Sequence, residues 1–310
     1  MKTNKLLPLL LLLALTVGAT AQEKSDKTIY IKGEKFTYPL VEKWITEYKK
    51  ENPKADIRII GKADASKTPD VNILARKPAD NEIDKDQQLT YVGRYALLPV
   101  SNKNNPLLSE IKKNGISKKE LKLLVFNGDP FDEEQPKSKI KSRINIYTRE
   151  TQASTAVTLA KHFGFNPSDI KGKKVTGDDN YLISAIKKDT IGITFNNIGS
   201  IFDLQTRKVK EDLALIPLDL KTEVKDQIFS SSLDQAIALL EKSNVETIPV
   251  EKIGFVVSKN ESNNPDVTGF LSWILKKGQE YNHELGFLNL TGDDLVEQQN
   301  QLHEKLLTLK

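Results

Sequence analysis

Short apolar runs alternate with helical patterns along most of this chain, and this alternation constrains its fold more than any other feature. Four runs with strand character come before residue 101, and they are residues 28–33, 54–60, 71–75 and 89–100. Between the first two, the segment from Tyr38 to Asn52 has the spacing of a helix with one apolar stripe. Because strands that alternate with helices form mostly parallel sheets covered on both faces, the sequence predicts an α/β fold.

The segment Ser142–Gly164 is the most informative of these strand–turn–helix units. It begins with strand-like alternation, passes through a polar turn and small residues, and ends with helical spacing and a glycine at the C-cap position. A helix start leaves unpaired backbone N–H groups, and with Arg149 just upstream these groups predict an anion cradle. An ordinary turn capped by Thr151 or Ser154 is an equally supported alternative.

Three turns after predicted strands point to one site. They are Gly33–Phe36, Ala75–Lys77 and Arg149–Thr155, and each is basic or polar. In open α/β sheets, ligands bind beyond the carboxyl ends of the strands. We therefore expect these turns to lie close together.

The first 21 residues have the pattern of a secretory signal peptide. Lys2 and Lys5 precede an apolar run, and small residues end at Ala21, after which we predict cleavage. The chain has no cysteine, so neither a disulfide nor a lipid on cysteine is available. With 46 basic and 42 acidic residues, its charge does not favour nucleic acid or a membrane surface as a partner. We predict an exported, soluble protein.

The residue pattern does not favour an enzyme. Cysteine is absent, and the histidines at 162, 283 and 303 do not adjoin a candidate nucleophile in sequence. Neither an H-x-x-H motif nor a carboxylate cluster suggests a metal, so we predict no catalytic residue, metal or cofactor. The acidic pairs Asp178–Asp179 and Asp293–Asp294 are interpreted as acids at helix starts, where the helix dipole favours them.

Three segments resemble motifs of bacterial periplasmic phosphate-binding proteins, the receptors of phosphate ABC importers. They are GEKFTYPLVEKW from Gly33, GDDNYLISAIKKDTIGITF from Gly177 and FLSWILKKGQEYNHELGFLNL from Phe270. The resemblance runs from Thr28 to about Leu290. It implies a type II periplasmic-binding-protein-like fold, with two α/β lobes, mostly parallel central sheets and an interdomain cleft. Residues 22–100 and 250–310 would form lobe 1, and residues 101–249 would form lobe 2.

The phosphate loop of that family, R-x-D-G-S-G-T, is matched only in part at Arg149–Thr155. Arg149 and Thr155 correspond directly, whereas the residues between them lack the family's aspartate and glycines. Arg76 and Lys77 stand where the family has a serine–aspartate pair, and Gly61–Asp64 replaces a Gly-Ser-Gly turn. An aspartate there repels fully deprotonated anions, so its replacement by cations is expected to favour a more highly charged or larger anion.

The resemblance implies an extracytoplasmic solute-binding protein that captures a small oxyanion, such as phosphate, by hinge closure. The expected partners are that ligand and an inner-membrane ABC permease, with the receptor itself a monomer. The candidate ligand-binding residues are Lys35, Phe36, Thr37, Arg76, Lys77, Arg149, Gln152, Ser154 and Thr155.

Each reading has an alternative. Arg76 and Lys77 could belong to a solvated turn, and Arg149 could form a surface salt bridge. The alternative for the whole chain is an envelope accessory protein that kept the fold, lost or changed the ligand, and acts through protein–protein interaction.

Overall fold

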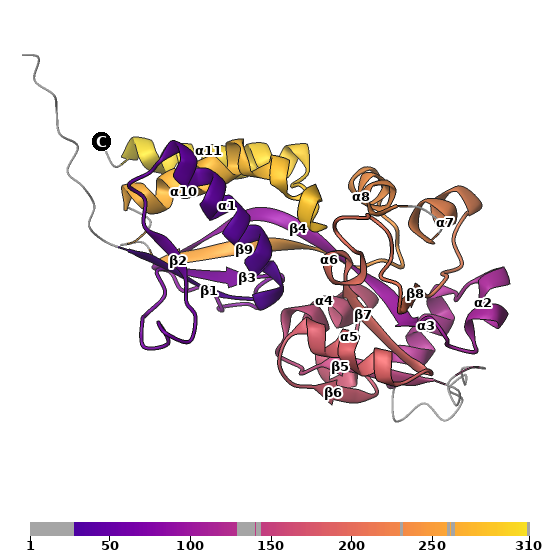
Figure 1. Ribbon diagram of the computed structural model, residues 1–310. Helices are drawn as coiled ribbons and strands as arrows, with labels where there is room; N and C mark the ends of the chain where they lie inside the picture. Colours follow the sequence, from indigo (N-terminus) through magenta and orange to yellow (C-terminus); the bar gives the residue numbers. More distant parts are fainter. Residues whose placement is uncertain are drawn as a thin grey trace, which may run out of the picture.

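The computed structural model describes residues 28–128, 140, 144–229, 232–258, 261 and 264–308. The predicted signal peptide, residues 1–21, lies outside the described residues. Figure 1 shows two bodies joined by the long strands β4 and β9. We call them the first and the second lobe and define them by their elements below.

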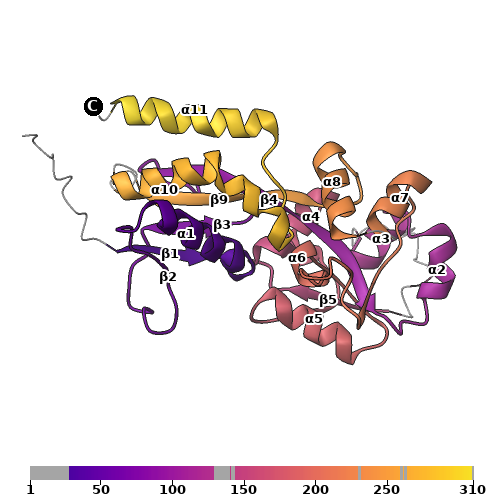
Figure 2. The same ribbon diagram turned by 45° about the horizontal axis from the view of Figure 1, so that its top comes forward.

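The first lobe is built on β1 (Ile29–Gly33), which lies between two parallel neighbours, β2 (Ile57–Ile59) and β3 (Val71–Leu74). Strand β9 (Val250–Ser258) continues this sheet antiparallel to β3. The helices of the lobe are α1 (Tyr38–Glu51), α10 (Pro265–Lys276) and α11 (Gly292–Thr308), with the 3-10 turns η1 (Lys35–Thr37), η4 (Gly278–Tyr281) and η5 (His283–Leu285). Helix α11 lies along the outside of α10 (Figure 2).

The second lobe repeats this plan. Strand β5 (Asn145–Arg149) lies between two parallel neighbours, β6 (Lys173–Val175) and β7 (Gly192–Asn197), and β8 (Leu213–Leu215) pairs with β4. The helices of this lobe are α2 (Leu108–Asn114), α3 (Lys118–Val125), α4 (Ser154–Phe163), α5 (Asp179–Lys188), α6 (Ile198–Ile201), α7 (Thr222–Phe229) and α8 (Leu233–Lys242), with η3 (Pro167–Asp169) after α4.

Strand β4 (Gln87–Asn102) belongs to both lobes. It pairs with β9 as far as Ala96 and with β7 from Leu97 onward, in both cases antiparallel. The α/β fold class and its two-lobed arrangement are therefore confirmed, with parallel strands at both ends of the sheet and antiparallel pairs around β4 and β9. The predicted lobe boundaries, at residues 100/101 and 249/250, stay a prediction.

Apolar helix stripes form the core of the first lobe. Helix α1 buries Leu40, Trp44 and Tyr48, as their spacing predicts. Trp44 is fully buried, packs edge-on against Phe255 of β9, and donates an indole hydrogen bond of 2.8 Å to the carbonyl of Gly278. The motif segments that begin at Gly33 and Phe270 are thus held against each other. Packing between them therefore accounts for the residues that these two motifs contain.

Several elements differ from the sequence expectation. Helices α2 and α7 and strand β6 have no predicted counterpart. The two helices have seven and eight residues, too few turns for a clear helical period. Strand β6 is an edge strand of sequence KKV whose two lysines are exposed, so it lacks apolar alternation.

Candidate functional site

A cavity of about 190 Å³ lies between the two lobes, where the carboxyl ends of β1 and β5 meet. From the first lobe it is lined by Gly33, Glu34, Lys35 and Phe36, and from the second by Arg149, Gly177, Asp178 and Asp179. Two of the three predicted turns therefore meet in one place. The turn at Ala75–Lys77 does not line this cavity.

Arg149 is the last residue of β5, and its guanidinium faces several groups of its own lobe. Its Nη1 and Nη2 donate hydrogen bonds to the carbonyls of Val175 and Gly177. Its Nε lies 3.4 Å from Oδ1 of Asp179 but is buried without a hydrogen-bond partner. Arg149 forms a largely buried ion pair inside the cleft, so the surface salt bridge considered from sequence is not observed.

The start of α4 carries two further predicted residues, Ser154 and Thr155. Both are buried, and each hydroxyl donates to a carboxylate: Ser154 to Glu34 at 2.6 Å, and Thr155 to Asp179 at 3.2 Å. The N-cap position belongs to Ala153, which has no side-chain cap, and Gly164 closes the helix in the left-handed conformation, as predicted. The small residues therefore turn hydroxyls toward carboxylates instead of capping the helix.

Residues 35–37 form the turn η1 that leads into α1. Lys35 and Phe36 line the cavity, and the Phe36 ring packs against Tyr95, with ring centroids 4.9 Å apart. Thr37 is buried, and both its hydroxyl and its backbone N–H donate to the carbonyl of Glu34. Thr37 therefore shapes the turn and does not line the cavity.

The structure places the remaining predicted residues outside the cavity lining. Arg76 follows β3 and forms a bidentate pair with Glu82, whose pKa it lowers. Lys77 and Gln152 are exposed. Glu82 neutralises Arg76, and the cavity itself is lined by carboxylates. The preference for a more highly charged or larger anion stays a prediction.

The cavity lining includes three acidic residues, Glu34, Asp178 and Asp179, which the sequence interpretation did not count among the ligand-binding residues. Asp179 is 6% exposed, and burial raises its pKa to about 6. The neighbouring Glu34 and Asp178 contribute to this rise, while Arg149 and Thr155 partly oppose it. Their sequence signal was present: Glu34 lies inside the first motif, and Asp178–Asp179 opens a helix. Asp178 caps α5 through the backbone N–H of Asn180, whereas Asp179 turns inward.

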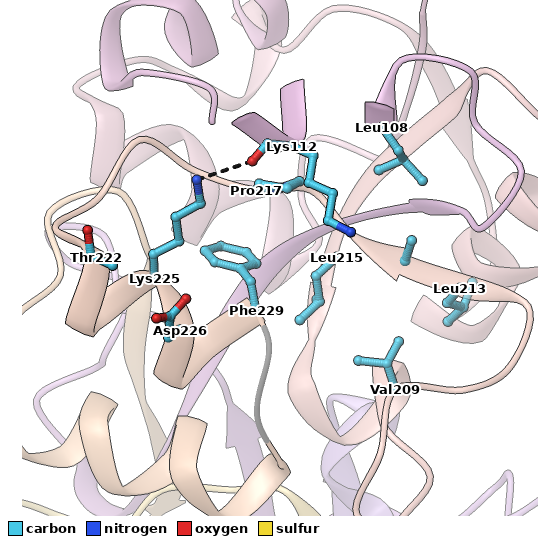
Figure 3. Close-up of a pocket in the computed structure, with 11 residues that line it drawn as sticks. Leu108, Lys112, Val209, Leu213, Leu215, Pro217, Thr222, Lys225, Asp226 and Phe229 are labelled. Carbon is cyan, nitrogen blue, oxygen red and sulfur yellow. Dashed lines mark hydrogen bonds between the residues drawn. The ribbon is translucent and has the colours of Figure 1, made fainter. Parts of the chain in front are cut away.

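A larger hollow, of about 650 Å³, lies in the second lobe between α2, β8 and α7 (Figure 3). Its floor is apolar, and Lys225 reaches across it to donate a 3.3 Å hydrogen bond to the carbonyl of Lys112. None of the predicted ligand residues lines this hollow, so it offers no support for an oxyanion site.

The part of the chain that the structure describes holds no group of three or more histidine, cysteine or acidic side chains able to hold a metal ion. His162 contacts the carbonyl of Glu246, and His283 pairs with Glu241, so both are engaged in local contacts. Among the described residues, none of the helices combines the length and the apolar character needed to cross a membrane.

Comparison with known proteins identifies similar folds among solved structures but no relative by sequence. No protein-family model matches the chain, and no curated protein does. Among solved structures, a putative phosphate ABC transporter substrate-binding protein with bound phosphate from Clostridium perfringens is 13% identical with a TM-score of 0.61, covering 86% of this chain and 100% of that one.

Two further structures are similar. A possible phosphate binding protein from Planctomyces limnophilus is 14% identical with a TM-score of 0.51, covering 90% of this chain and 98% of that one. An ABC-type phosphate transport receptor from Vibrio cholerae is 14% identical with a TM-score of 0.53, covering 84% and 100%. At this identity the likeness concerns the fold, and the chain has the two-lobed α/β fold of periplasmic binding proteins.

Proposed function

We propose that the chain is an extracytoplasmic solute-binding protein that captures a small oxyanion, phosphate or a phosphate-like anion, between its two lobes. The observation that carries the proposal is the position of Arg149, which lines the interlobe cavity at the end of β5, across from the turn at Gly33–Phe36. A guanidinium offers a planar fork that matches the oxygens of such anions. The likeness in fold to substrate-binding proteins supports the same role.

The proposal also covers where the protein acts in the cell and to which partner it delivers its ligand. We propose export to the periplasm after cleavage behind Ala21, and delivery of the ligand by a monomeric receptor to an inner-membrane ABC permease. Residues 22–100 with 250–310, and residues 101–249, would move as the two lobes. The chain would act as a receptor and not as an enzyme.

Calorimetric titration of the chain without residues 1–21 tests the ligand class. Inorganic phosphate, sulfate and tripolyphosphate are the probes, and we expect at least one to bind. Arg149→Ala should weaken that binding tenfold or more, because it removes a charge-assisted donor. Arg58→Ala is the matched control, since Arg58 pairs with Asp56 on the exposed surface and should leave binding unchanged. Absence of heat with all three anions would contradict the proposal.

The second candidate is an envelope accessory protein that acts through a protein partner. It is favoured by one observation: Ser154, Thr155 and Arg149 already face carboxylates of this chain. On that reading the melting temperature should not change with any anion. A rise of the melting temperature in phosphate would argue against it, since a ligand that binds the folded state stabilises it.

A further inference from the structure

Glu34 joins the two lobes through one short contact. It follows β1 in the first lobe, and its Oε1 accepts a 2.6 Å hydrogen bond from Oγ of Ser154, the first residue of α4 in the second lobe. Ser154 is completely buried. Because the N-cap of α4 has no side-chain acceptor, the carboxylate of Glu34 lies at a helix start that would otherwise suit an external anion.

Three other predicted ligand residues, Thr155, Arg149 and Arg76, also contact carboxylates of this chain. Asp179 accepts from Thr155 and pairs with Arg149, and Glu82 binds both arms of Arg76. Glu34 is distinctive because it comes from the opposite lobe, whereas Asp179 lies in the same lobe as the groups it faces. Loss of Glu34 would thus change the contact between the lobes.

We propose that Glu34 is an internal ligand of the cavity, whose carboxylate occupies the anion position at the start of α4 and holds the two lobes together when no ligand is bound. The proposal deepens the proposed function, on which it rests for the nature of the incoming ligand. An oxyanion that enters must displace Glu34 from Ser154. Glu34 therefore sets which anions the cleft admits and keeps the empty receptor closed.

The distance between the lobes in the absence of ligand tests this. The chain has no cysteine, so spin labels can be attached at two introduced positions alone. Thr46→Cys on α1 and Lys188→Cys on α5 are exposed and lie in different lobes. In this doubly labelled background we compare the native residues with Glu34→Ala and with Ser154→Ala, which remove the acceptor and the donor of the same hydrogen bond.

We expect both variants to shift the distance distribution to longer values, by more than the width of the distribution with Glu34 and Ser154 in place. Glu42→Ala, which removes an exposed carboxylate of α1, is the matched control and should not shift it. If the distribution stays unchanged in both Glu34→Ala and Ser154→Ala, the proposal is wrong. Using two variants from opposite lobes protects the test against the failure of either one to fold.

Titration with inorganic phosphate separates this inference from the proposed function. Glu34→Ala should bind phosphate at least tenfold more tightly than the chain with Glu34, because the internal competitor is gone, and phosphate should return the distance to its short value. Opening of both variants, with no binding of phosphate, sulfate or tripolyphosphate to any chain, would support the role of Glu34 in holding the lobes together and overturn the oxyanion function. Phosphate binding with an unchanged distance between the lobes in both variants would support the oxyanion function and overturn the role of Glu34.

Discussion

At the scale of single residues, Asp179 gives the cleft a predictable response to pH. Burial raises its pKa from 3.8 to about 6, so the folded chain holds this proton more tightly than the unfolded chain. The folded state therefore takes up a proton as the pH falls through about 6. The contribution of Asp179 to the free energy of unfolding should increase by about 1 kcal/mol between pH 7.5 and pH 5.

Urea denaturation across this range measures the effect in the native chain and in Asp179→Asn. His162 acts in the opposite sense, because burial lowers its pKa, so the readout is the difference in slope between the two chains. Asp178→Asn keeps an N-cap acceptor and leaves Asp179 in place; because Asp178 is the smallest of the causes that raise the Asp179 pKa, it should keep most of the native slope. Equal slopes in the native chain and in Asp179→Asn would show that Asp179 does not carry the expected shift.

The residues of the cleft could be predicted only where they carry a local pattern. Arg149, Ser154 and Thr155 were found because a strand, a polar turn and a helix start follow one another in sequence. Glu34 and Asp179 were not, because an acid near a helix start already has a local explanation in the helix dipole. Their role depends on partners in other elements, and Glu34 finds its partner 120 residues away.

At the scale of elements, two glycines with positive φ, Gly164 at the end of α4 and Gly172 just before β6, should differ sharply in their tolerance of a side chain. A Cβ at Gly172, where φ is +96°, would overlap the carbonyl oxygen of Ile146 on β5. A Cβ at Gly164, where φ is +82°, would meet no atom within 4 Å. We expect Gly164→Ala to cost about 1 kcal/mol, for the backbone conformation alone, and Gly172→Ala on the order of 3 kcal/mol.

Chemical denaturation of both variants measures the two costs. The comparison is matched, because both positions receive the same methyl group in the same backbone region. Similar losses would mean that the space beside Ile146 can adapt. Since β5 ends at Arg149, Gly172→Ala should also lower the affinity for any ligand that Arg149 binds, whereas Gly164→Ala should leave that affinity unchanged.

Most elements of this chain could be predicted from local periodicity, but their pairing could not. The stripe of α1 and the C-cap of α4 follow from residue spacing and from one glycine. The change of partner in β4 after Ala96 has no local signal, because the strand remains buried and apolar on both sides of that point. Pairing between distant strands depends on which surfaces meet in the folded chain, and so β4 and β9 were expected to be strands without being expected to be antiparallel.

At the scale of the whole molecule, Arg207 makes a further contact between the lobes, away from the cavity lining. In the second lobe its guanidinium binds the carboxylate of Asp234, and it also donates to the carbonyls of His283 and Glu284 in η5, at 2.8 and 3.0 Å. Close by, Gly286 approaches Gly199 of α6 so tightly that a Cβ on either would be crowded. The two lobes are thus joined at this side independently of Glu34.

Replacement of Arg207 should therefore lower the free energy of unfolding more than replacement of an ordinary surface arginine does. Arg207→Ala leaves two carbonyls of η5 without a donor, and we expect it to lower the free energy of unfolding by about 2 kcal/mol. Arg58→Ala removes a bidentate pair with Asp56 that lies within one lobe and is half-exposed, and should cost less than about 1 kcal/mol. Arg207→Lys should fall between them, because one ammonium cannot reproduce the planar fork. Urea denaturation gives all three values, and equal losses for Arg207→Ala and Arg58→Ala would mean that the contact at η5 does not stabilise the arrangement of the lobes.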